Sequence, residues 1–261
     1  CMDGFILTHA YERVDIPEQA QVDRFLPPYE PRQVLDPNDP VTIGAMVGPE
    51  AFTEVRYLAH AKQMQALDLI PQIAAEFKKE FGRDSGGLIK TYKTEDAETI
   101  VIALGSVLGT IKDTVDDLRA EGVKVVVLGI TSYRPFPISA IRDATAHAKR
   151  IVVIEKCFAV GIGGIVSRDV RSAVRNRPQP VLTVVAGLGG RAITKTSVHQ
   201  LLLDAIADKL ELLTFLDLDW AVVNRVLERE KQQRRSGPVA EGILRDMGTA
   251  APAPTPLSPT R

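Results

Sequence analysis

The fold of this chain is decided by Thr99-Ile-Val-Ile-Ala-Leu-Gly-Ser106, then Thr110-Ile-Lys-Asp-Thr-Val-Asp-Asp-Leu-Arg119, then Val123-Lys-Val-Val-Val-Leu128. The first and third pieces are apolar, β-branched runs of strand length. The middle piece places Ile111, Val115 and Leu118 at the spacing of one helical face. Gly122 then stands where the end of a helix favours a residue that adopts positive φ. The stretch therefore predicts a strand, a helix and a second strand.

The same pattern recurs downstream. Strands are expected at Arg150-Ile-Val-Val-Ile-Glu155 and at Pro180-Val-Leu-Thr-Val-Val-Ala186, and a glycine-rich turn follows each. Strands that are apolar along their whole length are buried on both faces, which is typical of a parallel sheet covered by helices. The predicted fold class is α/β, with a mostly parallel sheet flanked by helices.

Composition excludes several classes of protein. The 261 residues carry a formal net charge of −1, which gives no electrostatic signal for nucleic acid or an anionic membrane. The apolar runs have strand length, too short to cross a bilayer. The two cysteines, Cys1 and Cys157, are too few for a disulfide framework or for the usual four ligands of an iron–sulfur cluster. A reducing, cytoplasmic compartment is the simplest expectation.

Four segments are expected along the chain. Residues 1–11 read as the last strand and loop of a truncated domain, so the sequence is interpreted as a fragment. Residues 12–40 carry six prolines and are predicted to be an extended linker between domains. Residues 41–232 form the α/β domain, and 233–261 are predicted to be a disordered tail.

Further helices and an edge strand are predicted before and after the four strands in the sequence. Helical spacing between 49 and 81 predicts a long helix that Pro71 splits or kinks and Gly82 ends. Residues 88–92 are a candidate edge strand, and 198–206 form a helical stripe. A shorter helix follows, capped by Asp219, with an apolar face made of Trp220, Val223 and Leu227.

A first candidate site is the loop Ser132-Tyr-Arg-Pro-Phe-Pro137. It follows a strand, and the carboxyl ends of strands are where open α/β sheets bind ligands. Arg134 is therefore a candidate donor to a phosphate or carboxylate. The alternative is structural: Pro137 begins the next helix and Phe136 packs beneath it.

Two glycine-rich loops are further candidates, Gly161-Ile-Gly-Gly164 and Gly187-Leu-Gly-Gly190. Each precedes a helix, where backbone N–H groups can bind an anion, which makes Gly163, Gly164, Gly189 and Gly190 candidate binding residues. Neither loop matches the dinucleotide fingerprint or a P-loop. The alternative is that the glycines allow strand and helix to approach closely. Arg191, directly after the second loop, favours contact with an anionic partner.

Histidine and cysteine supply no catalytic pattern. The histidines at 9, 60, 147 and 199 are scattered singly, so no metal-binding spacing exists. Cys157 follows Lys156, and a cation lowers a thiol pKa, but a cysteine after a strand more often packs than reacts. The residues alone predict an α/β domain without a catalytic centre of its own.

Five separated motifs, in order, carry a resemblance to a known family. They are Pro40-Val-Thr-Ile-Gly-Ala-Met-Val-Gly-Pro-Glu-Ala-Phe52, Tyr92-Lys-Thr-Glu-Asp-Ala-Glu-Thr-Ile-Val-Ile-Ala-Leu-Gly-Ser106, Arg134-Pro-Phe-Pro137, Glu155-Lys-Cys-Phe-Ala-Val-Gly-Ile-Gly-Gly164 and Ala186-Gly-Leu-Gly-Gly-Arg191. Together they resemble the C-terminal part of the alpha subunit of pyruvate (2-oxoacid):ferredoxin oxidoreductase. In that resemblance, residues 1–11 end a thiamine-pyrimidine-type domain, and the α/β domain is similar to the C-terminal domain of transketolase.

The resemblance implies a function and a set of partners. It implies thiamine-dependent oxidative decarboxylation of a 2-oxoacid, with pyruvate the default, to give acyl-coenzyme A and electrons for ferredoxin. Thiamine diphosphate with Mg²⁺ would bind mostly through other segments, beside a beta subunit, and iron–sulfur clusters would lie on gamma and delta subunits. No residue here takes a catalytic role. Arg134, Gly163, Gly164, Gly189, Gly190 and Arg191 are expected to face coenzyme A or a neighbouring subunit.

Other readings stay open at this stage. An arylglyoxylate or other 2-oxoacid relative with a different electron acceptor would share the architecture. A free-standing α/β module that binds a ligand, or one that serves only assembly, is also compatible with the motifs, because a fold by itself does not fix a function.

Overall fold

The computed structural model describes residues 11, 13–42, 44–93, 96, 98–232 and 239–248. The chain divides into two compact units, Cys1–Leu216 and Asp217–Arg261, which are described separately. The predicted end of a truncated domain at 1–11 lies outside the described residues except for Tyr11. Within the described ranges, no helix has both the length and the apolar character needed to cross a membrane.

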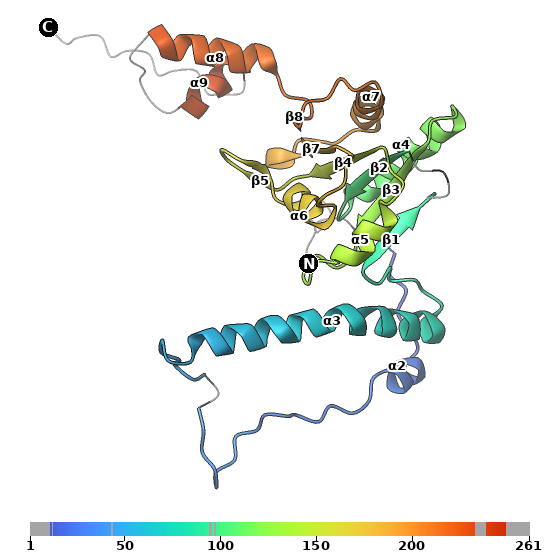
Figure 1. Ribbon diagram of the computed structural model, residues 1–261, viewed down its shortest axis with the longest axis vertical. Helices are drawn as coiled ribbons and strands as arrows, with labels where there is room; N and C mark the ends of the chain where they lie inside the picture. Colours follow the sequence, from blue (N-terminus) through green and yellow to red (C-terminus); the bar gives the residue numbers. More distant parts are fainter. Residues whose placement is uncertain are drawn as a thin grey trace, which may run out of the picture. The chain divides into compact units, whose positions relative to one another are not determined.

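The first unit is built on a six-stranded sheet with the strand order β1-β3-β2-β4-β7-β8 (Figure 1). Only β1 is antiparallel, and it pairs with β3 at the edge of the sheet. The other pairs are parallel, so the predicted mostly parallel sheet and its edge strand are confirmed. The strands are β1 Ile89–Tyr92, β2 Thr99–Ala103, β3 Val125–Ile130, β4 Arg150–Glu155, β7 Val181–Val185 and β8 Leu213–Phe215.

Helices cover both faces of this sheet (Figure 1). On one face α4, Val107–Ala120, and α7, Lys195–Ile206, share a core with alternate strand residues such as Val101. On the other face α5, Ile138–Ala144, and α6, Val166–Ala173, share a second core with neighbours such as Ile100. The apolar strand runs are buried on both sides because each face has its own helix layer.

The decisive helix forms as its sequence predicts. Ile111, Val115 and Leu118 of α4 are fully buried against the sheet, which confirms the predicted stripe. Gly122 has φ +84, beyond the last helical residue, so a side chain there would be strained. The strand, helix and strand of the opening motif are therefore confirmed.

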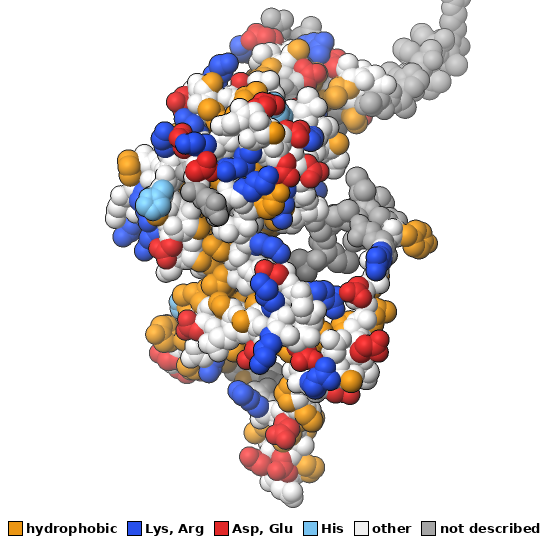
Figure 2. Space-filling view, turned by 90° about the vertical axis from the view of Figure 1, so that its right-hand side faces the viewer, with side chains coloured by type: hydrophobic (Ala, Val, Ile, Leu, Met, Phe, Trp, Pro, Cys, Tyr) orange, Lys and Arg blue, Asp and Glu red, His pale blue; other side chains and the backbone are white. Residues whose placement is uncertain are grey.

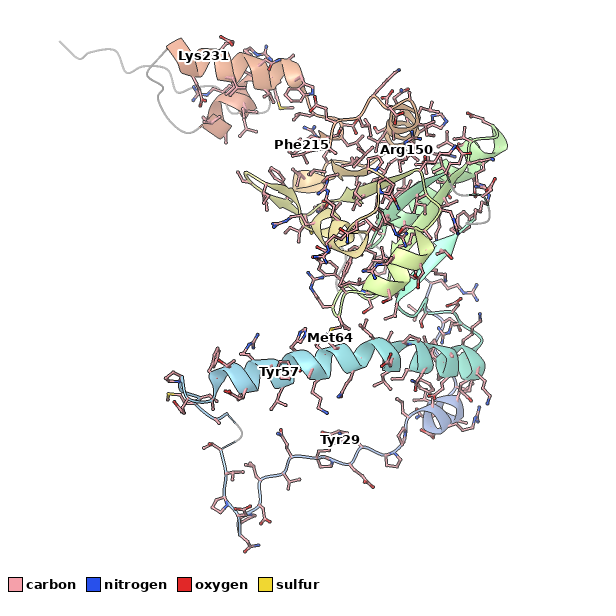
Figure 3. All side chains as sticks on the ribbon, viewed as in Figure 1. Tyr29, Tyr57, Met64, Arg150, Phe215 and Lys231 are labelled. Carbon is pink, nitrogen blue, oxygen red and sulfur yellow. The ribbon has the colours of Figure 1, made fainter. Side chains whose placement is uncertain are left out.

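Helix α3, Phe52–Phe81, is one continuous helix that contains Pro71, so of the two outcomes predicted for the proline, a split or a kink, the split does not occur. It ends at Gly82 with φ +68, as predicted. None of its residues is buried. Tyr57 and Met64 are labelled among the side chains that stand out from the ribbon in Figure 3. This helix therefore presents apolar side chains to solvent in the isolated chain.

A short helix interrupts the predicted extended linker. Helix α2, Gln19–Phe25, lies between two prolines that are far enough apart to allow it. The Phe25 ring meets those of Phe77 and Phe81 edge-on at centroid distances of 5.7 and 5.3 Å. Arg24 Nη2 lies 2.6 Å from Glu80 Oε1. The segment is therefore docked on the C-terminal end of α3 rather than extended throughout.

The second unit contains α8, Trp220–Gln232, and α9, Val239–Asp246. The Asp219 carboxylate accepts from the Val222 backbone N–H at 3.1 Å, which confirms the predicted cap. The predicted apolar face is wrong: Val222 is buried, whereas Trp220 is 61% exposed. Helix α9 lies inside the stretch predicted to be disordered, so the structure differs there. An Arg229 guanidinium N–H donates to both oxygens of Asp246 at 3.2 Å and joins the two helices.

Surface charge is mixed rather than segregated. On the face drawn in Figure 2, Lys and Arg side chains alternate with Asp and Glu side chains. This agrees with a net charge near zero. That face offers no extended region of one sign.

Candidate functional site

A cleft of about 1020 Å³ opens at the carboxyl ends of β2, β4 and β7. After β2 the chain crosses to β3 on one side, and β4, β7 and β8 then build the sheet outward on the other side. The direction of winding thus reverses between β2 and β4. Ligands of doubly wound sheets bind at this switch point, outside the carboxyl ends of the strands.

The lining of the cleft combines apolar and polar side chains. Leu104, Val107, Ile154 and Ile193 contribute apolar surface. Polar groups come from the strand-end loops and from the first turn of α4: Ser106, Thr110, Glu155, Lys156, Cys157 and Arg191. A concave apolar surface with a few convergent polar groups is the usual form of a small-molecule site.

The loop after β7 brings three predicted residues to this cleft. Gly189 and Gly190 have φ +64 and +83, and a Cβ at either would meet no atom within 4 Å. Glycine is therefore favoured at both positions because the backbone of the turn is left-handed, and not because another group packs closely against it. Because the turn follows β7 directly, it brings Arg191 to the cleft beside them.

The loop after β4 contains an anion site that the chain itself fills. The Glu155 carboxylate accepts from the backbone N–H groups of Ile165 and Val166, both at 2.8 Å, and of Ser167 at 2.9 Å. These groups form the N-terminus of α6, which attracts negative charge. The backbone N–H groups at this helix start therefore bind an anion, but the anion is Glu155 of the same chain, and the donors are the residues after Gly163 and Gly164 rather than these glycines.

Gly164 makes that arrangement possible. A Cβ at this position would overlap the Glu155 carboxylate and stand 2.6 Å from Ser167 Oγ. Gly163 has φ +102, and a Cβ there would lie 3.4 Å from Leu213. The close approach considered for this loop is therefore present at Gly164, whereas the N–H groups that bind the carboxylate belong to the residues that follow it.

Glu155 is a residue that the sequence patterns did not identify as part of a site. It is the last residue of β4 and is only 6% exposed. Burial lowers the pKa of nearby Arg171, and the negative charge of Glu155 opposes that shift. A carboxylate at the end of an apolar strand, followed by Gly-Gly and a helix, is the sequence signal that could have identified it.

Arg134 lies elsewhere. Its Nη2 is 2.7 Å from Asp169 Oδ2 on α6, and its guanidinium lies over the Tyr133 ring at 4.0 Å. Burial, followed by the charge of Asp169, raises the pKa of Tyr133. Phe136 packs against the core beneath α5, as the structural alternative expected, while Pro137 is the residue before that helix. Arg134 is not among the residues that line the cleft.

Metal chemistry has no ready ligand set in the described part of the chain. Its residues contain no group of three or more His, Cys, Asp or Glu that could hold a metal ion. Cys157 is an exposed free thiol in the cleft. The described residues therefore supply no set of three such ligands for the Mg²⁺ of thiamine diphosphate or for an iron–sulfur cluster.

Two family models match the chain. Pyruvate:ferredoxin oxidoreductase core domain II matches residues 97–198, which include β2, β4, β7 and the cleft. The thiamine diphosphate-binding model of pyruvate flavodoxin/ferredoxin oxidoreductase matches residues 1–75. The two regions follow one another without overlap.

Individual relatives agree with the models. Pyruvate synthase subunit PorA of Methanosarcina barkeri is 43% identical over 205 residues, which cover 77% of this chain and 51% of the relative. Ketoisovalerate oxidoreductase subunit VorA of Pyrococcus horikoshii is 36% identical over 198 residues, which cover 75% and 50%. The chain spans about half the length of these curated relatives.

Among solved structures, a 2-oxoglutarate:ferredoxin oxidoreductase from Magnetococcus marinus, with 2-oxoglutarate, coenzyme A and succinyl-CoA bound, matches with a TM-score of 0.37 and 20% identity. It covers 52% of this chain and 21% of the other. This structural likeness is weak, and the sequence matches are strong. By its two matched regions and its identity to these relatives, the chain belongs to the pyruvate:ferredoxin oxidoreductase family.

Proposed function

We propose that this chain is part of the alpha subunit of a 2-oxoacid:ferredoxin oxidoreductase, which converts a 2-oxoacid and coenzyme A to acyl-coenzyme A and carbon dioxide and passes the electrons released to ferredoxin. The observation that carries the proposal is the 43% identity to a pyruvate synthase subunit across three quarters of the chain. Pyruvate is the default substrate, although a ketoisovalerate oxidoreductase subunit is also similar to this chain.

Within that complex the α/β unit supports assembly. The catalytic chemistry falls to groups held elsewhere: thiamine diphosphate with Mg²⁺ beside a beta subunit, and iron–sulfur clusters on gamma and delta subunits that pass electrons to ferredoxin. The compartment is the cytoplasm. The strand-end residues Arg134, Gly189, Gly190 and Arg191 face a neighbouring subunit or the path of coenzyme A. The two other candidates, Gly163 and Gly164, are buried beside Leu213 and Glu155 and are left out of this role. Support comes from the placement of Gly189, Gly190 and Arg191 at the cleft.

Replacing Arg191 with alanine in the whole complex tests this role. The KM for coenzyme A is expected to rise about tenfold, or the complex to dissociate on gel filtration, because a charge-assisted contact contributes about 1.5 to 3 kcal/mol. Steady-state kinetics and co-elution measure the two effects. Lys209→Ala is the matched control, because Lys209 lies in the turn after α7, outside the cleft lining. Unchanged assembly and kinetics in Arg191→Ala would refute the role.

A further inference from the structure

We propose that one apolar face of helix α3 packs against the remainder of a thiamine-binding domain that lies outside these 261 residues. The proposal rests on the proposed function, because it takes the chain to be part of a 2-oxoacid oxidoreductase. It goes further by naming the contact surface, the partner and the side chains that meet it.

The face is an apolar stripe along α3. Its members recur every three or four residues, with one polar position midway, so they share one side of the helix over about 30 Å. They are Phe52, Val55, Ala59, Ala66, Leu69 and Ile73. The four large members are 44 to 55% exposed, and no residue of the helix is buried. A contiguous apolar surface of this kind marks a contact with another protein surface.

The polar position midway along the α3 stripe is Lys62. Its Nζ donates to Gln65 Oε1 at 3.3 Å, so the ammonium group lies beside a polar side chain while its methylene stem stays with the apolar residues. Two α3 helices that paired symmetrically over the whole stripe, parallel or antiparallel, would bring their Lys62 side chains together. Because like charges placed face to face are unfavourable, a second copy of this chain is a poor occupant of the stripe.

The family matches identify a better occupant. The thiamine diphosphate-binding model matches residues 1–75, and core domain II matches residues 97–198. The stripe, from Phe52 to Ile73, lies wholly inside the first match. The chain spans about half the length of its relatives, so the rest of a thiamine-binding domain can lie in the half that it does not span.

The intramolecular contacts of α3 agree with this division. Helix α2 docks only on the C-terminal end of α3, where the Phe25 ring meets those of Phe77 and Phe81. Both of these α3 residues lie beyond the thiamine diphosphate-binding match. The end of the helix outside that match is therefore covered by this chain itself. The uncovered stripe coincides with the part that belongs by sequence to a thiamine-binding domain.

Photocrosslinking in the native complex tests the proposal. The photoreactive amino acid p-benzoylphenylalanine takes the place of Leu69 on the stripe or of Met64 on the other side of the helix, and mass spectrometry identifies the crosslinked peptides. Position 69 is expected to crosslink to a thiamine-binding domain outside these 261 residues, and position 64 is not.

Three outcomes would overturn the proposal: equal yields from the two positions, crosslinks from position 69 only to an iron–sulfur subunit or to a second α3, and no crosslink from position 69. Turnover of a 2-oxoacid by the unmodified complex is measured separately. A failure of the proposed function is therefore distinguishable from a failure of the proposed contact.

A double variant, Leu69→Gln with Ile73→Gln, gives a second readout. The isolated chain is expected to melt at nearly the parent temperature, because both side chains are already exposed there. The melting temperature of the complex should fall by about 5 °C or more, because two apolar side chains lose a buried contact. Tyr57→Gln with Met64→Gln, two exposed residues off the stripe, is the matched control and should shift neither. An unchanged melting temperature of the complex, or an equal fall in the isolated chain, would contradict the proposal.

Discussion

Replacing Gly164 with alanine is expected to lower the free energy of unfolding by about 3 kcal/mol. The new Cβ would overlap the Glu155 carboxylate, which is held by three backbone N–H groups at the start of α6. The carboxylate must then leave those groups, or the strand and helix must separate. Urea denaturation followed by circular dichroism measures the loss.

Gly109→Ala is the matched control. Gly109 lies inside α4, and a Cβ there meets no atom within 4 Å. Alanine is the better helix former, so this substitution should raise the free energy of unfolding by about 0.5 to 1 kcal/mol. Equal effects at the two glycines would contradict the account of Gly164.

Replacing Glu155 with alanine is expected to cost a similar amount, about 3 kcal/mol, because it leaves three N–H groups without their acceptor. Glu155→Gln keeps one acceptor oxygen and should cost roughly half as much. The same denaturation experiment measures both. A loss below about 1 kcal/mol for Glu155→Ala, the size of an ordinary hydrogen bond, would show that water replaces the carboxylate.

The two substitutions should not be additive. Once Glu155 is alanine, the main obstacle to a side chain at position 164 is gone, although Ser167 Oγ still stands 2.6 Å from the Cβ site. Gly164→Ala should therefore cost much less in the Glu155→Ala background than alone, as expected for residues in contact. Full additivity would mean that the two sites act independently.

Local sequence patterns predicted most of the sheet. The runs that became β2, β3, β4 and β7 were visible because strands buried on both faces are apolar throughout. The stripe of Ile111, Val115 and Leu118 and the turn at Gly122 were readable for the same reason, since burial and positive φ restrict the residue type at each position. Strand β8 was missed because Leu213–Phe215 has three residues and is only half-buried.

The order of the strands could not be read locally. Each apolar run predicts a strand, but which strands pair with it in the sheet depends on the crossover connections. The switch point between β2 and β4 is therefore visible only in the three-dimensional structure. The apolar face assigned to α8 failed for a related reason. Trp220 and Val222 lie on different sides of one helix turn, and tertiary packing decided which side was buried.

The candidate site was predicted in part. The sequence placed Arg134 and Arg191 together at one edge of the sheet, but Arg134 pairs with Asp169 while Arg191 lines the cleft. Glycine-rich loops were recognised as possible anion sites, yet the anion found beside one of them, Glu155, lies 10 to 12 residues before the N–H groups that bind it. A contact across that separation leaves no periodic signal.

The subunit inventory of the native complex that contains this chain tests the central claim most directly. Affinity purification and intact mass measurement should find the chain together with thiamine-binding and iron–sulfur subunits, in a preparation that reduces ferredoxin when given a 2-oxoacid and coenzyme A. A single species without partners, and without that activity, would contradict the assignment to a 2-oxoacid:ferredoxin oxidoreductase.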